Sequence, residues 1–167
     1  MNSFDQTESD RAQRNSELGL PVAIRLAPIW RRMLAQVLDQ LVVFVPVVIV
    51  AFVLGVRTAD DLTARAFALN VAVVCTGFVY ECTMIALWGR TIGKFALGTR
   101  AVRVDTAGGV LWSSSAIRAL VPLAAGVIPG IGFALSIAVY ATAMFDKRQQ
   151  GWHDKAAGTI VVLNASV

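Results

Sequence analysis

Four charged side chains lie within or at the edges of segments that are otherwise hydrocarbon. Asp39 and Glu81 interrupt apolar runs. Arg32 and Arg118 lie near the starts of two such runs. Ionisable side chains in a membrane are costly, and they face one another or a polar cavity. Two close carboxylates in a low dielectric do not both ionise cheaply, so one holds a proton unless an arginine or a cation compensates it.

These residue types therefore suit a proton-coupled cation site. They equally suit a structural network of ion pairs that locks helices together, and the residue types alone do not choose between the two. In the first interpretation Asp39 is the proton or cation carboxylate, Arg32 tunes its pKa, and Glu81 is its partner. In the second, the same charges are assembly contacts.

The spacing of the charges predicts that they share one depth. Arg32, Gln36 and Asp39 follow the helical spacing i, i+4, i+7, so they form one polar stripe. Asp39 comes seven residues after Arg32, about 10 Å along a helix. Glu81 comes seven residues before the end of the second, antiparallel run, and Arg118 enters from the same side. We therefore expect one inward-facing cluster a short way below one membrane surface.

The composition indicates a membrane protein. Of 167 residues, 56% are hydrophobic and only 16% are charged, with a mean hydropathy of +0.64. An ordinary soluble domain is nearer one quarter charged. The net charge of +4 comes without basic runs interleaved with aromatics, which argues against nucleic-acid binding.

The sequence also argues against an enzyme, and we expect no cofactor or metal. The single histidine, His153, and its neighbour Asp154 are too few ligands for a zinc site. Cys75 and Cys82 lie seven apart, too far along one helix for a disulfide. No Ser/His/Asp or Cys/His set has plausible partners for catalysis. We expect His153 and Asp154 instead to anchor the C-terminal tail under the cluster.

The chain divides into a polar tail and a membrane domain. Residues 1–27 are polar and of mixed charge, which predicts a disordered N-terminal tail. Residues 28–163 form the predicted membrane domain, and residues 164–167 form a short C-terminal tail. Two apolar segments, at about 33–56 and 66–88, are long enough to cross a hydrocarbon core of about 30 Å as helices.

The third apolar segment, at about 116–145, leaves two structures open. Pro122, Gly126 and the pair Pro129–Gly130 break it near its middle. It is either one tilted, kinked span or a re-entrant hairpin of two half-length helices. The fold class is thus an all-α integral membrane protein with two clear spans and one broken segment.

The distribution of basic residues favours the hairpin. The loop between the first two spans holds only Arg57 and Arg65, whereas basic residues gather before the first span, after the second and after the third segment. By the positive-inside rule, the N-terminus, the 89–115 loop and the C-terminal tail are all predicted to be cytoplasmic. A single crossing by the third segment would place the basic tail outside. The expected location is the plasma membrane, with multiple passes.

The loop after the second span is basic and rich in glycine. Its "GRTIGK" lacks the GK[ST] of a phosphate loop, because Lys94 is followed by Phe95. We expect its glycines to permit tight turns at the membrane surface, and Arg90 and Lys94 to bind anionic head groups. The loop residues singled out are Gly89, Thr91, Gly93, Lys94 and Gly98. Farther on, "TRAVRVD" and "TIVVLN" alternate as strands do, which predicts a small cytoplasmic strand pair.

Four motifs together resemble the RDD family of small bacterial membrane proteins. "RRMLAQVLD" resembles its R-x-x-A-x-x-x-D, and "GRTIGKFALG" is similar to its G-x-T-x-GK-x-x-x-G. Arg118 opens the third segment as in family members, and "DKAAGT" resembles the D-x-x-A-G-T ending. The four occur in order between about Pro28 and Leu163. By this resemblance Asp154, in preference to Asp146, is the second aspartate of the family name and joins the charged cluster.

The resemblance implies a transport-related membrane protein, cation/proton antiport having been suggested for some members. The residues themselves do not specify that activity. The alternative is a non-transporting scaffold or accessory subunit. Three membrane segments are too few to enclose a pathway, so we expect a homo-oligomer or a membrane partner protein, besides the lipid bilayer and its anionic head groups.

Overall fold

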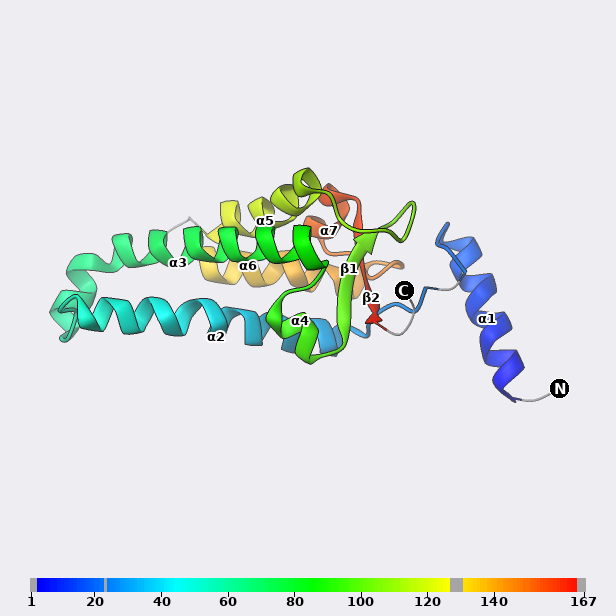
Figure 1. The fold of residues 1–167 in the computed structure, drawn as a ribbon, viewed down its shortest axis with the longest axis horizontal. Coiled ribbons are helices and arrows are strands. Elements are labelled where there is room, and N and C mark those ends of the chain that lie inside the picture. The colour runs from blue at the N-terminus through cyan, green and yellow to red at the C-terminus, as the bar shows by residue number, and fades with distance from the viewer. Residues whose placement is uncertain (1–2, 23, 127–130, 165–167) are drawn as a thin grey trace.

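Two long antiparallel helices form the body of the molecule in the computed structural model, which describes residues 3–22, 24–126 and 131–164. Helix α2 comprises Ile29–Val53 and α3 comprises Ala59–Trp88. They lie side by side in Figure 1. Both are long and apolar enough to cross a membrane, and at 1.5 Å per residue each is longer than a hydrocarbon core of about 30 Å. The two predicted membrane helices are therefore present.

The turn between these helices explains why α3 begins seven residues before the predicted boundary. The Thr58 hydroxyl accepts a hydrogen bond from the Asp61 N–H, and the Asp61 carboxylate accepts one from the Thr58 N–H. This reciprocal cap satisfies two of the free N–H groups at the start of a helix. The polar residues that the sequence suggested were a loop thus form the first turns of α3.

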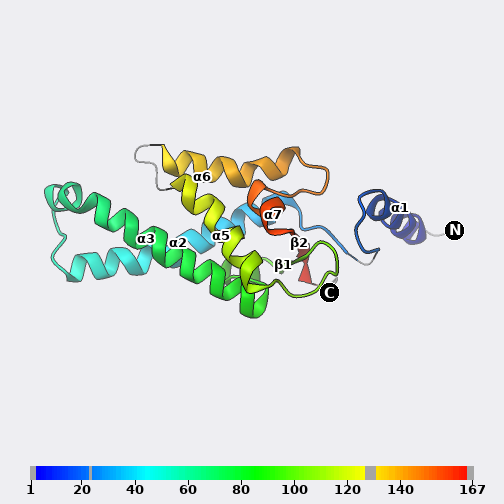
Figure 2. The same cartoon turned by 90° about the horizontal axis from the view of Figure 1, so that it is seen from above.

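The third apolar segment is folded as two helices. Helix α5 comprises Trp112–Gly126 and α6 comprises Gly132–Ala141, followed by the short 3-10 helix η1, Thr142–Phe145. At 1.5 Å per residue α5 and α6 are about 22 and 15 Å long, less than a hydrocarbon core of about 30 Å. They contact one another, and α5 also contacts α3 (Figure 2). Pro122 lies inside α5 without ending it, and the predicted break at Pro129–Gly130 lies outside the described residues.

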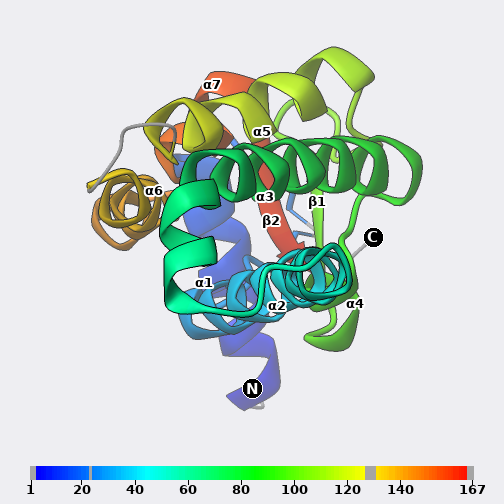
Figure 3. The same ribbon diagram turned by 90° about the vertical axis from the view of Figure 1, so that its left-hand side faces the viewer.

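A two-stranded sheet lies at the end of the bundle where α2 begins and α3 ends (Figure 1). Strand β1, Thr99–Arg103, pairs antiparallel with β2, Thr159–Leu163. Each strand follows a short helix, α4 (Ile92–Ala96) before β1 and α7 (Trp152–Ala157) before β2. Seen from the opposite end, α3 lies between α2 and α5, with the strands behind (Figure 3).

The N-terminal segment departs from the expected disordered tail. Residues Ser3–Glu17 form helix α1, which lies apart from the bundle in Figure 1. After it, Leu20 and Ile24 are buried against Ile160 and Val162 of β2. The sequence did not single out these apolar residues, because the segment is polar on average. They cover one face of a two-stranded sheet that would otherwise lie open.

We expect Ile24→Ala to lower the thermal unfolding midpoint in detergent clearly, with a loss of stability of about 2–5 kcal/mol, because a fully buried isoleucine side chain is truncated. Val22→Ala is the matched control, since Val22 is 62% exposed two residues away. Its stability should stay within about 0.5 kcal/mol of wild type. Equal midpoints for the two variants would show that the segment does not pack on the sheet.

Candidate functional site

Six charged side chains converge at the sheet end of the bundle. They come from five helices. Among the described residues, the cluster contains three acids and three bases. None of the six side chains is more than 12% exposed. The charge cluster consists of Arg32, Asp39, Glu81, Lys94, Arg118 and Asp154.

Asp154 is the most buried member of the cluster and joins two arginines. Its side chain is 0% exposed, and one carboxylate oxygen accepts from Arg32 while the other accepts from Arg118. The Gly151 N–H also donates to it, at 3.3 Å. Burial alone would raise the pKa of Asp154, but the charges of Arg118 and Arg32 outweigh burial and hold that pKa below its usual range. Asp154 is therefore a fixed anion that ties α2 and α5 to α7.

Asp39 is saturated with hydrogen-bond donors. The Tyr80 hydroxyl donates to Oδ1 at 2.8 Å, the Gly93 N–H donates to Oδ1 at 2.8 Å, and the Thr91 hydroxyl donates to Oδ2 at 2.5 Å. The Lys94 ammonium lies 3.5 Å from Oδ2. These donors occupy both oxygens of the carboxylate. Asp39 thus attaches α4 and α3 to α2.

The close approach of α4 to α2 requires a glycine. A Cβ added to Gly93 would lie 2.1 Å from the backbone oxygen of Ala35 and 2.9 Å from Asp39 Oδ1. Neither distance is compatible with a side chain. The close contact therefore requires glycine at position 93, whereas Gly89 and Gly98 have positive φ angles of 67° and 64° and make the predicted turns.

Glu81 is the least compensated acid of the cluster. Its contacts are 3.5 Å to Arg118 Nε, 4.0 Å to Lys94 Nζ and 3.4 Å to the Tyr140 hydroxyl. The reason is competition: Arg118 directs Nη1 at Asp154, and the Lys94 ammonium lies closer to Asp39. With a side chain 12% exposed, Glu81 is also the most accessible acid of the three.

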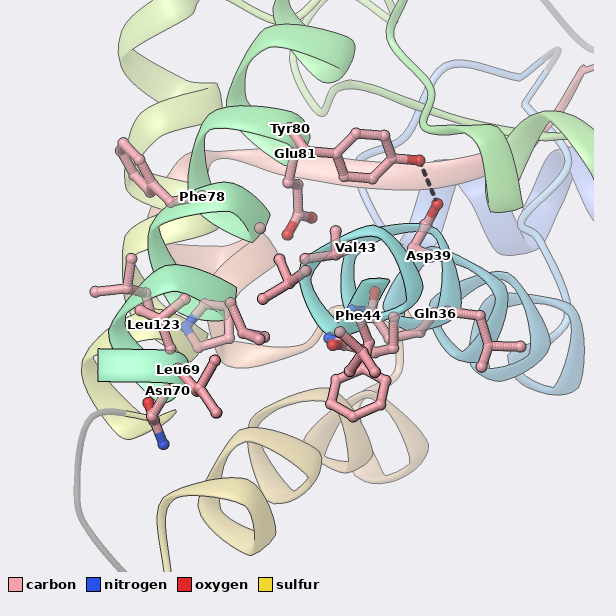
Figure 4. A pocket seen from close by; sticks show the side chains of 18 of the residues that line it. Gln36, Asp39, Val43, Phe44, Leu69, Asn70, Phe78, Tyr80, Glu81 and Leu123 are labelled. Carbon is pink, nitrogen blue, oxygen red and sulfur yellow. Dashed lines mark hydrogen bonds between the residues drawn. The ribbon is translucent and has the colours of Figure 1, made fainter. Parts of the chain in front are cut away.

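Glu81 lines a groove of about 990 Å³ between α2, α3 and α5. In Figure 4 its carboxylate points into the space between α3 and α2, whereas the Tyr80 hydroxyl turns towards Asp39. The groove follows α2 from Met33 to Phe52, and its walls are mostly hydrocarbon. Three amides also line it, Gln36, Gln40 and Asn70.

His153 is buried behind the cluster and is neutral. Burial, with smaller contributions from Arg118 and Arg32, lowers its pKa to about 3, although Asp154 opposes this shift. Its Nε2 lies 3.5 Å from Asp154 Oδ1, so the contact joins a neutral ring to a carboxylate. The ring also packs on Tyr140, with centroids 4.4 Å apart. His153 thus fills the space under the cluster, next to the residues that anchor α7.

The structure brings together all five charged residues that the sequence singled out, but pairs them differently. Arg32 was expected to tune Asp39, and it instead contacts Asp154. Lys94 was expected to bind head groups at the surface, yet its side chain is only 6% exposed and it lies between Asp39 and Glu81. The α4 turn carries it inward because the Thr91 side chain caps that helix by accepting from the Lys94 N–H.

Sequence reasoning missed three groups of the site. The Tyr80 hydroxyl donates to Asp39 and the Tyr140 hydroxyl donates to Glu81. Asn70 lines the groove midway along α3. A signal existed for Tyr80, because it adjoins Glu81 in the sequence. Tyr140 had none, since its approach to Glu81 depends on how α6 packs.

The model of the RDD family matches residues 26–158, most of the chain. No curated protein and no solved structure matches.

We expect Asp154→Asn to lower stability by about 3–5 kcal/mol, because Arg32 and Arg118 would be left as buried, uncompensated charges. The measurement is the thermal unfolding midpoint of the purified protein. Asp105→Asn is the matched control: Asp105 also pairs with an arginine, Arg103, but its side chain is 60% exposed, so little change is expected. A midpoint for Asp154→Asn as high as that of the control would refute the role of Asp154.

Proposed function

The chain belongs to the RDD family of membrane proteins, and from this premise we propose that it acts in transport, exchanging a cation for a proton at Glu81. One observation carries the proposal. Of the three acids in the charge cluster, only Glu81 has every contact at 3.4 Å or longer and a side chain on the groove. A carboxylate that exchanges ions must release its partners, and those of Glu81 are the weakest.

The sequence suggested Asp39 as the exchanging carboxylate. Because Asp39 already accepts several hydrogen bonds, we propose Glu81 for this role instead. A cation that bound Asp39 would have to displace or compete with three hydrogen bonds of 2.8 Å or less and an ammonium at 3.5 Å. Asp39 then positions α4, which carries Lys94 towards Glu81. In this proposal catalysis has no part, and the protein binds and moves its ligand unchanged.

The proposed topology places the sheet end in the cytoplasm of a plasma-membrane protein. Helices α2 and α3 cross the bilayer, whereas α5 and α6, each shorter than the hydrocarbon core, enter and return. Basic residues at the sheet end support this orientation under the positive-inside rule. Both termini then lie on the cytoplasmic side, where Arg31 and Arg90 are placed to contact anionic head groups. The open groove favours a homo-oligomer or a partner protein that completes the pathway.

A second candidate function is a membrane scaffold or accessory subunit. The equal count of acids and bases in the charge cluster favours it, because a balanced, mutually paired network holds helices without any exchange. Buried ion pairs of this kind specify how elements fit together even when their net contribution to stability is small.

Proteoliposome flux distinguishes the two candidates. We expect Glu81→Gln to reduce cation-driven proton flux to the level of empty vesicles, because a neutral amide exchanges no proton. Asp39→Asn, reconstituted at matched amount and oligomeric state, should retain flux and mainly lose stability. Glu8→Gln is the control, since the Glu8 side chain is 71% exposed on α1.

Undiminished flux in Glu81→Gln would contradict the exchange mechanism. If wild type shows no flux, and the charge variants instead change the oligomeric state, the scaffold function is supported.

A further inference from the structure

We propose that the exchanged cation is the ammonium group of an amphipathic amine whose hydrocarbon chain lies in the groove. This inference names the substrate class of the Glu81 site and rests on the proposed function for the exchange step. It is carried by the shape of the groove, by its lining and by the unequal compensation of the two carboxylates at its end.

The groove walls suit a hydrocarbon chain. Apolar side chains, mostly from α2, α3 and α5, line the groove over most of its length, and the amides of Gln36, Gln40 and Asn70 are spaced among them. Burial of apolar surface contributes about 25 cal/mol per Å² to the affinity of such a chain, when that chain is otherwise in water. Representative wall residues are Val43, Phe44, Val47, Leu69, Val73 and Leu123.

The groove is long enough for an alkyl chain. From Asp39 to Phe52 it follows α2 for about 20 Å at 1.5 Å per residue. A hydrocarbon chain whose ammonium lies at Glu81 can therefore lie along the groove.

The polar end of the groove selects a hydrogen-bond donor with positive charge. Asp39 already accepts from three donors, so Glu81 offers the remaining acceptor capacity. Its two cationic neighbours lie at 3.5 and 4.0 Å and direct their closer contacts elsewhere. An anionic head group would meet two carboxylates at this end. An ammonium group would donate to Glu81 and complement its charge.

The same end suits an organic cation better than a bare metal ion. Hard divalent cations such as calcium take six to eight oxygen ligands. Glu81 and Tyr140 supply three oxygens between them, and the groove continues past them into the side chains of Val43 and Leu123. An ammonium needs only two or three acceptors and brings its own hydrocarbon to fill the rest.

The exchange step balances in charge. The carboxylate of Glu81 binds the ammonium, which keeps its proton and all its covalent bonds. Release of the ammonium leaves the carboxylate, which then takes up one proton, and loss of that proton readies it for another ammonium. One positive charge therefore moves in each direction per cycle.

Native mass spectrometry of the purified protein in detergent tests the ligand class directly. The probe is dodecylamine hydrochloride, and dodecanol and sodium dodecanoate are the neutral and anionic probes of equal chain length. Two variants report on the two halves of the site. Glu81→Gln removes the carboxylate, and Gly77→Leu puts a side chain into the groove, where a Cβ would meet Val43 at an ordinary 3.7 Å. Glu8→Gln serves again as the exposed control.

We expect one dodecylamine per protein, bound more tightly than dodecanol or dodecanoate. Loss of a charge-assisted hydrogen bond should weaken amine binding by about tenfold or more in Glu81→Gln, and Gly77→Leu should weaken binding of all three probes. The control should bind as wild type does. Equal binding of the three probes, unchanged amine binding in Glu81→Gln, or a co-purified phospholipid that the amine cannot displace would overturn the proposal.

The outcomes separate this inference from the function on which it rests. Selective amine binding without amine-driven proton flux supports the ligand class and contradicts the exchange mechanism. Alkali-cation/proton flux that depends on Glu81, without selective amine binding, supports the exchange mechanism and overturns the ligand class.

Discussion

The contact of Asp154 with two arginines is the interaction on which the rest of the site depends. Arg32 comes from α2 and Arg118 from α5, so one buried carboxylate in α7 holds three segments that are distant in sequence. Because Arg32 Nη2 and Arg118 Nη1 are directed at Asp154, Glu81 keeps only the longer contact with Arg118 Nε, and Asp39 has Lys94 as its cationic partner. Without this contact, two buried cations would lie next to them and the balance of the cluster would be lost.

The second constraint is the contact between α4 and α2, which gives Asp39 and Glu81 different sets of partners. Gly93 lets α4 approach closely enough for its N–H to reach Asp39, and Thr91 adds a hydroxyl. Asp39 is thereby held, and Lys94 is brought between it and Glu81. Glu81 keeps only long contacts and lies on the groove. Two similar carboxylates, predicted to share one depth, thus have different environments and different proposed roles.

The sequence predicted the elements of the fold better than their partners. The apolar runs indicated α2 and α3, and alternation indicated both strands, because these signals are periodic and local. The gathering of Arg32, Asp39, Glu81 and Arg118 also followed from helical spacing. Which acid meets which base did not, because it depends on how α4 and α7 fold against the bundle. The buried Lys94 in particular looked like a surface lysine, since its loop is basic and rich in glycine.

We propose that Glu81 is the carboxylate that exchanges its partners, whereas Asp39 and Asp154 hold α4 and α7 in place. Infrared spectroscopy of the purified protein across a pH titration tests it most directly, because a protonated carboxyl absorbs apart from a carboxylate. We predict that the protonated-carboxyl band appearing at lower pH, before the protein unfolds, is lost in Glu81→Gln and kept in Asp39→Asn. A band that persists in Glu81→Gln and disappears in Asp39→Asn would contradict the account.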